Sequence, residues 1–178
     1  MNYRRVFVQN AYLHIIITSY ERKHVFINNI NILRDAFKNT MQLYKYEIIA
    51  ICVLPEHIHL ILYPENINNY PKIISSIKHY FSRNVGQVCP TYKLKSGYKN
   101  KREKGIFQRR YWEHTIISEK DLDNQINYIH YNPVKHGFAQ NVKDWNYSSF
   151  HKYVKQGLYQ DDWGTFEDIK NIKDLNLE

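Results

Sequence analysis

The 178-residue sequence predicts one α+β domain with the ferredoxin-like (RRM-like) element order β-α-β-β-α-β, followed by one more helix and a C-terminal aromatic appendage. Three observations predict it: short β-branched runs, longer stretches with apolar residues at helical spacing, and one very short break between two strands. Such a fold has an antiparallel sheet with helices on one face. We expect the other face to be free for a ligand.

The four strands are predicted from short apolar runs bounded by turn residues. Only Pro55 and Glu56 separate the second run from the third, so these two strands must form a tight antiparallel hairpin. The predicted strands cover Tyr12 to Ser19, Tyr46 to Leu54, His57 to Tyr63 and Glu113 to Ile117.

The helices are predicted from apolar residues that recur three or four positions apart. Ser118 lies three residues before Asp121, which resembles a capping box at a helix start, and Pro133 is expected to stop that helix. Ile126 and Ile129 belong to its buried stripe. The predicted helices cover Asn28 to Leu43, Tyr70 to Asn84, and the segment from the Ser118 cap to about Asn132.

The composition limits the class of protein. Hydrophobic residues make up 43% and charged residues 24%, which excludes wholesale disorder and a bundle of membrane helices. No apolar run approaches the ~20 residues of a transmembrane helix, and the first residues lack a signal-peptide core. Two cysteines are too few for a disulfide scaffold or a zinc ribbon. We therefore expect a cytoplasmic protein with no membrane partner.

Charge and tyrosine content favour a polyanionic partner. The net charge is +8 and there are sixteen tyrosines, although an AT-rich genome would also raise Lys and Tyr. Between Lys93 and Arg110, eight basic residues accompany one acid, Glu103, a local charge of +7. This stretch belongs to a basic loop predicted at about residues 86–108. The stretch could be an ordinary run of solvated charges. Its flanking aromatic residues instead favour a surface that follows the phosphates of a nucleic acid and stacks with its bases.

Two histidines on the third predicted strand suggest half of a metal site. His57 and His59 flank Ile58, and alternate strand residues share a face, so the two imidazoles lie together. Neutral imidazoles side by side can bind a divalent metal ion. A lone His-x-His pair is often incidental. Histidines packed into this apolar strand would, however, need buried partners that are hard to supply, which favours the metal interpretation.

The last predicted helix offers the second half of such a site. Tyr128 and Asn132 are four residues apart and share one helical face. The amide oxygen could complete a site for a hard ion, and the phenol could act as a nucleophile beside it. His130 and Tyr131 compete for these roles by proximity, but Tyr131 should project about 100° away from Asn132. On its own, a Tyr and an Asn at this spacing lie more often on the surface or at the edge of the core than in a functional site.

Three segments carry a more specific signal: Leu54 to Leu60, Gln108 to His114 and Tyr128 to Gly137. In this order they resemble successive motifs of the REP-associated tyrosine transposases, a group of the IS200-like, single-tyrosine HUH transposases and nucleases. The tail segments Asp144 to His151 and Gly157 to Tyr159 also resemble members of that group. The similar stretches span most of the chain, and the ferredoxin-like order is also the fold of that family.

The resemblance implies a role for each motif residue. His57 and His59 would be metal ligands, Asn132 the third ligand and Tyr128 the nucleophile, with Mg²⁺ or Mn²⁺ as the ion. The implied protein is a bacterial, metal-dependent endonuclease and strand transferase that cuts single-stranded DNA near a REP-like hairpin. Attack by Tyr128 would give a 5′-phosphotyrosine link and a free 3′-OH. The alternative is a non-catalytic ferredoxin-like module that binds single-stranded nucleic acid.

Contacts to DNA are expected from basic and aromatic side chains. For Trp112 a place in the core is an equal alternative, and Arg4 and Arg5 form either an N-terminal arm or an ordinary basic terminus. We expect residues 1–137 to form the catalytic domain and residues 138–178 an appendage packed on it, in a monomer or a homodimer. The candidate DNA-binding residues are Lys101, Arg102, Arg109, Arg110, Tyr111, Trp112, Arg4 and Arg5.

Overall fold

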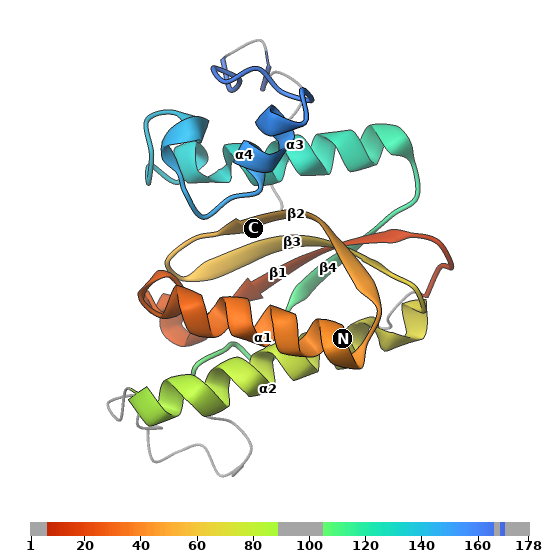
Figure 1. Cartoon of the computed structure of the whole chain (residues 1–178), viewed down its shortest axis with the longest axis vertical. Helices are drawn as coiled ribbons and strands as arrows, with labels where there is room; N and C mark the ends of the chain where they lie inside the picture. Colours follow the sequence, from red (N-terminus) through yellow and green to blue (C-terminus); the bar gives the residue numbers. More distant parts are fainter. Residues whose placement is uncertain (1–6, 89–104, 166–167, 170–178) are drawn as a thin grey trace.

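A four-stranded antiparallel sheet forms the middle layer of the protein (Figure 1). The computed structural model describes residues 7–88, 105–165 and 168–169. Across the sheet the strand order is β2-β3-β1-β4, and the chain order is β-α-β-β-α-β, so the predicted ferredoxin-like class is confirmed. The strands are β1 (Tyr12–Thr18), β2 (Tyr46–Val53), β3 (His57–Pro64) and β4 (Trp112–Ile116).

Strand β1 lies between β3 and β4 and pairs antiparallel with both. Within this register His14 faces Ile61 of β3 on one side and His114 of β4 on the other. The predicted hairpin of β2 and β3 is confirmed, and the two strands pair over nearly their full length. The register therefore brings polar residues from distant parts of the sequence to neighbouring positions on one face.

Two helices, α1 (Ile30–Leu43) and α2 (Tyr70–Val88), pack against each other on one face of the sheet (Figure 1). The main apolar core lies between them and the sheet. Fully burying an aliphatic side chain contributes roughly 1.5–3 kcal/mol, so this face stabilises much of the fold. The residues that β1 and β3 contribute to this core alternate along each strand and are Leu13, Ile15, Ile17, Ile58, Leu60 and Leu62.

The opposite face is covered too, which corrects the expectation that it is free for a ligand. Helix α3 (Glu119–Lys135) crosses it and packs mainly on β2 and β3 (Figure 1). The physical reason is a second apolar set on the sheet, which includes Ala50, Cys52 and Ile61 and is buried by Ile126 and Ile129 of α3. An exposed apolar sheet face would cost free energy, and the helix removes it from water.

Helix α3 also runs past the predicted stop. Pro133 lies inside the helix, which ends at Lys135. Proline removes only its own N–H from the helical ladder, and the turn that follows is closed by the His136 N–H, which donates to the Asn132 carbonyl at 3.0 Å. At the other end the Ser118 side chain accepts from the Asp121 N–H, as the sequence predicts.

The C-terminal segment packs against α3 and the edge of β2. Helix α4 (Phe150–Lys155) follows a turn in which the Trp145 indole donates to the Val53 carbonyl at 3.0 Å. Phe150 and Tyr159 stack with ring centroids 5.6 Å apart beside α3. The division at residue 137 remains a prediction. Four short 3-10 helices complete the described elements: Tyr20–Arg22, Ile27–Asn29, Ile67–Asn69 and Val142–Asp144.

Candidate active site between the sheet and helix α3

Four histidines of the sheet face one side of helix α3. They belong to three strands: His14 to β1, His57 and His59 to β3, and His114 to β4. Helix α3 presents a polar stripe to them, with residues three or four positions apart, so that they follow one another along one side. The members of this stripe are Asp121, Gln125, Tyr128, Asn132 and, at the C-cap position directly after the helix, His136.

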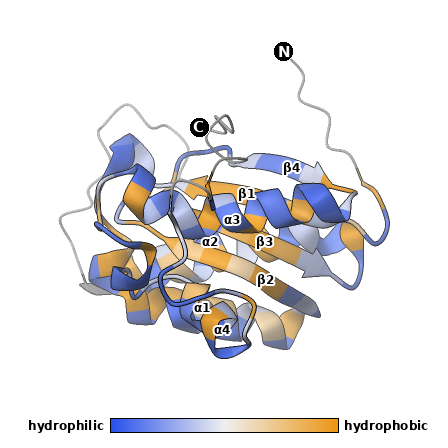
Figure 2. Ribbon diagram, turned by 90° about the horizontal axis from the view of Figure 1, so that it is seen from above, coloured by the Kyte–Doolittle hydropathy of each residue, from blue (hydrophilic) through white to orange (hydrophobic). Residues whose placement is uncertain are grey.

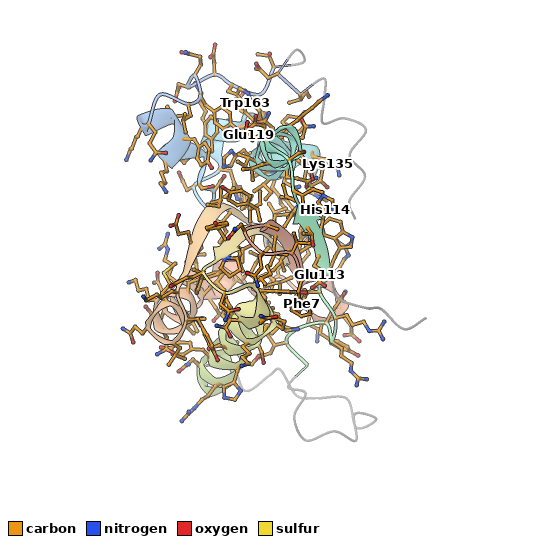
Figure 3. All side chains as sticks on the ribbon, turned by 90° about the vertical axis from the view of Figure 1, so that its right-hand side faces the viewer. Phe7, Glu113, His114, Glu119, Lys135 and Trp163 are labelled. Atoms are coloured by element: carbon orange, nitrogen blue, oxygen red, sulfur yellow. The ribbon has the colours of Figure 1, made fainter. Side chains whose placement is uncertain are left out.

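Adjacent residues of β4 show how the sheet separates its two faces (Figure 3). Glu113 points toward the α1 and α2 layer, where its carboxylate accepts a hydrogen bond from the Tyr70 hydroxyl at 3.0 Å. His114 points toward α3, where its Nε2 lies 2.8 Å from Oδ2 of Asp121. The period of two along a strand thus assigns neighbouring side chains to different layers.

The histidine pair is arranged as the sequence predicts. The rings of His57 and His59 lie side by side with centroids 4.9 Å apart, while Ile58 between them packs in the opposite core. Both histidines are buried, with 1% and 0% of their surface exposed. Burial of two imidazoles is unfavourable unless their nitrogens have partners, and the surrounding side chains supply partners for the Nδ1 atoms of both rings.

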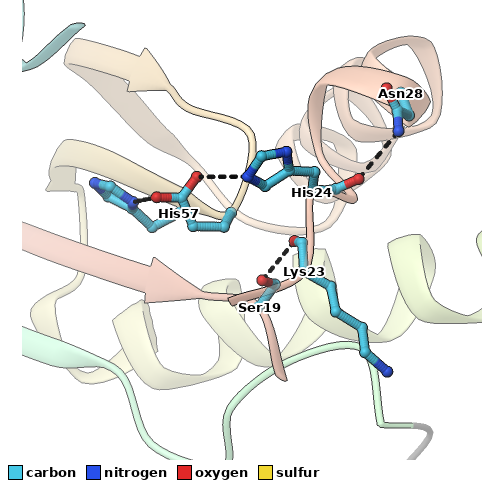
Figure 4. Close-up of polar contacts among 6 residues, drawn as sticks. Ser19, Lys23, His24, Asn28 and His57 are labelled. Carbon is cyan, nitrogen blue, oxygen red and sulfur yellow. Dashed lines mark hydrogen bonds and ion pairs between the residues drawn. The ribbon is translucent and has the colours of Figure 1, made fainter. Parts of the chain in front are cut away.

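A carboxylate orients the first histidine. The Nδ1 atom of His57 lies 3.2 Å from Oε1 of Glu56, in the turn between β2 and β3 (Figure 4). The other carboxylate oxygen is 4.0 Å from Nε2 of His24. Glu56 therefore has a defined place next to the site, where its carboxylate can accept from Nδ1–H of His57, which leaves the lone pair of that ring on Nε2.

A chain of polar side chains reaches the second histidine. Nδ1 of His59 lies 3.2 Å from Nε2 of His14, and Nδ1 of His14 lies 2.6 Å from Oε1 of Gln125. The Gln125 amide donates to Oδ1 of Asp121 at 3.1 Å, and Oδ2 of Asp121 contacts His114. The sheet and α3 are therefore joined by a continuous polar network.

Two buried histidines have strongly shifted pKa values. Burial, helped by neighbouring His59, lowers the pKa of His14 to about 3. Burial alone lowers the pKa of His130 to about 3, and Nε2 of that residue lies 2.8 Å from the Ser149 hydroxyl. Both imidazoles are therefore neutral near pH 7.

Tyr128 lies against the histidine pair. Its side chain is 2% exposed, and its ring centroid is 5.7 Å from that of His59. Nζ of Lys135 donates to the phenol oxygen at 2.8 Å and also lies over the ring. Tyr128 and Ile169 form a small apolar cluster, against which Tyr131 packs. The phenol oxygen thus has a cation beside it, which stabilises negative charge at that atom.

Asn132 lies along α3 between two positions that meet the histidine pair. Tyr128, one turn earlier, contacts His59, and His136, one turn later, has its ring 5.0 Å from that of His57. The Asn132 side chain is fully buried, and neither its Oδ1 nor its Nδ2 has a hydrogen-bond partner among the described residues. Such a buried amide is costly on its own, whereas a cation bound at Oδ1 would compensate it.

These residues fit a divalent metal ion as a set of two imidazoles and one amide oxygen. In the part of the chain that the structure describes, no three His, Cys, Asp or Glu side chains are grouped as metal ligands would be. Among the described residues, the buried amide of Asn132 is the candidate for a third protein donor. A site with few protein ligands keeps positions open for substrate oxygens.

A small cavity opens beside His57. Its volume is about 160 Å³, and Trp112, Gln108, Arg110 and Arg22 contribute to its walls. Trp112 is 37% exposed and makes an edge contact with the His14 ring at 5.3 Å. Arg22 belongs to a turn with positive φ, 49° at its own backbone, a conformation that is uncommon for residues other than glycine. The cavity thus combines a ring and two guanidinium groups next to the predicted metal ligands.

The structure separates the predicted DNA-contacting residues. Arg109 and Arg110 are exposed, and Trp112 borders the site, whereas Tyr111 is half-buried and packs against the main core. All eight remain predictions as DNA contacts. The other four lie outside the described residues: Lys101, Arg102, Arg4 and Arg5.

Sequence reasoning missed several residues that border the site. His14 and His114 lie in predicted strands, but only the pairing of β1 with β3 and β4 brings them beside His59 and Asp121. One available signal was the isolated polar residue His14 in an otherwise apolar run. Another was the repeated polar spacing along the last helix, which extends the Tyr128 and Asn132 pair in both directions. The missed residues are His14, His114, Asp121, Gln125, Lys135 and His136.

None of the described helices is both long enough and apolar enough to cross a membrane.

Comparison with known proteins gives one consistent result. A family model described as IS200-like transposase matches residues 7–132. A Haemophilus influenzae protein assigned to the REP-associated tyrosine transposases is 45% identical over 177 residues, which cover 98% of this chain and 99% of that protein.

Two further relatives agree. The REP-associated tyrosine transposase of Escherichia coli is 32% identical over 163 residues, which cover 90% of this chain and 89% of that protein. A solved structure of a REP-associated tyrosine transposase bound to a REP hairpin has a TM-score of 0.82 and 31% identity, and the match covers 99% of this chain and 96% of the solved one.

Proposed function

Because this chain belongs to the IS200-like transposases and, within them, to the REP-associated tyrosine transposases, we propose that it is a metal-dependent endonuclease and strand transferase for single-stranded DNA beside a hairpin. The observation that carries this proposal is the position of Tyr128. Its phenol lies against the His59 ring and accepts a hydrogen bond from the Lys135 ammonium. The proposed nucleophile, a cation and the proposed metal ligands thus lie close together.

His57, His59 and Asn132 would hold the ion, which we propose to be Mg²⁺ or Mn²⁺. When bound, it would polarise a phosphate oxygen and stabilise the charge that develops during phosphoryl transfer. Glu56 and His14 contact the Nδ1 atoms of the two histidines and hold the rings in place. The buried amide of Asn132 supports the proposal, because it needs a polar partner that the described residues do not supply.

The reaction that we propose exchanges one ester bond for another. The phenol oxygen of Tyr128 bonds to phosphorus while the bond from phosphorus to the 3′ oxygen of the preceding nucleotide breaks. The phenol loses its proton, and the departing 3′ oxygen gains one. The products are a 5′-phosphotyrosine link and a free 3′-OH, which can reverse the reaction on another strand. Lys135 stabilises negative charge on the attacking oxygen, because its ammonium lies 2.8 Å away.

The DNA would approach along the open side of the site. Trp112 and Arg110 border the cavity beside His57, so an unpaired base could stack on the indole while the guanidinium contacts a phosphate. Arg109 extends this basic surface. A hairpin flanked by single strands is the proposed substrate, which is supported by the related structure bound to a REP hairpin.

A covalent-trapping experiment tests this function. Labelled hairpin DNA with single-stranded flanks is incubated with the protein and Mg²⁺ or Mn²⁺, and protein–DNA adducts are separated under denaturing conditions. We expect an adduct with the unaltered protein and none with Tyr128→Phe. The matched control is Tyr131→Phe. It alters a half-buried phenol that packs against the same cluster as Tyr128, and this variant should still form the adduct.

Two outcomes would contradict the proposal. An adduct that persists in Tyr128→Phe would assign the nucleophile to another residue. Binding of many REP-like hairpins without any cleavage would favour the alternative function, a non-catalytic module for single-stranded nucleic acid.

A further inference from the structure

A hydrogen-bond chain runs from the protein surface to the buried His59. Its five members are His114, Asp121, Gln125, His14 and His59, linked by the four contacts of 2.6 to 3.2 Å described above. The His114 side chain is 39% exposed, whereas His14 and His59 are fully buried. The chain therefore connects an open end, where charge is solvated, with a closed end in the site.

The direction of each hydrogen bond follows from the carboxylate at the open end. The Asp121 carboxylate accepts from the Gln125 amide, which therefore turns its NH₂ group toward Asp121. The Gln125 oxygen then faces His14 and can only accept, so Nδ1 of His14 carries the proton. The nitrogens of His14 face an amide and an imidazole, neither of them anionic, and a buried imidazole in that setting is neutral.

The same logic determines the state of His59. Because the single proton of His14 is on Nδ1, its Nε2 has a lone pair and accepts from Nδ1–H of His59. Nε2 of His59 then carries the other lone pair and is the nitrogen able to bind a cation. His57 reaches the same state by a shorter route, since its Nδ1 faces the Glu56 carboxylate directly.

We propose that His14, Gln125 and Asp121 are positioning residues, which hold His59 in the tautomer with the proton on Nδ1 and the lone pair on Nε2. The proposal rests on the proposed function, in which His59 is a metal ligand. It goes further by giving α3 a second role, because the helix that carries the nucleophile also prepares a ligand on the sheet. Cation binding and nucleophile placement are thereby coupled through one element.

The tautomer can be measured without metal. Protein with ¹⁵N-labelled histidine is studied by long-range ¹H–¹⁵N correlation NMR at a pH at which the imidazoles are neutral. We expect the unaltered protein to show His59 protonated at Nδ1, and His14→Phe to populate the Nε2-protonated form. Mn²⁺ titration should show ~10–100-fold weaker binding for His14→Phe, the usual effect of removing a partner of a metal-bound histidine.

The matched control is His130→Phe. His130 is also fully buried and neutral, but it bonds Ser149 and has no place in the chain. This variant should leave the His59 tautomer and the Mn²⁺ affinity unchanged. If His14→Phe does not fold, Gln125→Leu provides the second test, because it removes the acceptor that orients His14.

Each result decides the proposal. His59 protonated at Nε2 in the unaltered protein would overturn it, and so would a tautomer that stays the same in both His14→Phe and Gln125→Leu. If the unaltered protein binds no Mn²⁺, the proposed metal site is wrong, while the metal-free tautomer measurement still tests the chain. The two failures are therefore distinguishable.

Discussion

The two faces of the sheet use the same strands for different purposes. On β3, Leu60 and its alternate neighbours pack under α1 and α2, whereas His57 and His59 face α3. The first face buries mainly carbon-rich side chains, which need no specific partners; the Tyr70 hydroxyl, which donates to Glu113, is an exception. The second buries imidazoles and amides, each of which needs a partner at a defined distance and angle. One layer therefore tolerates exchange among apolar residues, while the other depends on individual atoms.

The α3 face itself is divided. Toward β2 it is apolar, where Cys52 and Ala50 meet Ile126 and Ile129. The ribbon of β2 is largely coloured as hydrophobic in Figure 2. Toward β1 and β4 it is polar. The apolar half docks the helix on the sheet, and this docking places the polar half of α3 over the histidines. On this face, the apolar residues that dock the helix are thus direct neighbours of the polar residues of the site.

The strongest test of the comparison uses two adjacent residues of β3. His59→Ala should lower DNA cleavage by about 10³-fold or more, since metal assistance contributes several kcal/mol to phosphoryl transfer. Leu60→Ala should instead lower the free energy of unfolding by about 2–5 kcal/mol through a cavity in the main core. Cleavage rates at a temperature where both variants are folded, and urea denaturation, measure the two effects.

The comparison fails if the effects do not separate. Equal loss of cleavage in both variants, at full folding, would mean that the α1 and α2 face also determines the site. Retained cleavage in His59→Ala would remove that histidine from the chemistry. Hairpin binding, followed by fluorescence anisotropy, should remain close to that of the unaltered protein in both variants.

A second test concerns the charge beside the nucleophile. Lys135→Met keeps the aliphatic stem but removes the ammonium that donates to Tyr128 at 2.8 Å. We expect cleavage to slow by about 100–1,000-fold, the range for loss of one hydrogen-bond donor to a reacting oxygen, with little change in stability. Lys120→Met, an exposed change on the same helix, is the control. Equal rates for the two variants would show that the Lys135 contact does not contribute.

The sequence predicts the face of the sheet under α1 and α2 better than the face under α3. Alternation along β3 is enough to place His57 and His59 together and Ile58 opposite them, and helical spacing is enough to pair Tyr128 with Asn132. The contact of His14 with Gln125 is different, because it requires both the strand order and the rotation of α3 about its axis. Neither is encoded in a local period. The coverage of the second face was mispredicted, since the apolar residues Ala50 and Ile61 were assigned no partner.

The smallest expected effect is an acid sensitivity that belongs to the α3 face. Burial lowers the pKa of both His14 and His130 to about 3, against 6.5 for the free group. Between these values the unfolded chain takes up protons and the folded chain does not, so stability is full above pH 6.5 and falls as the pH drops toward 3. The slope is up to about 1.4 kcal/mol per pH unit for each of the two histidines.

Urea denaturation at several pH values between 7.5 and 4.5 measures how much each face contributes to the pH dependence of the free energy of unfolding. His130→Phe should reduce the slope by the share of one histidine, because phenylalanine takes up no proton in either state. Leu60→Ala should lower stability at every pH by a similar amount and leave the slope unchanged, because the α1 and α2 face contributes an apolar core and no comparable buried histidine among the described residues. A slope that His130→Phe does not reduce would assign the acid sensitivity to other groups, and an altered slope in Leu60→Ala would show that the two layers titrate together.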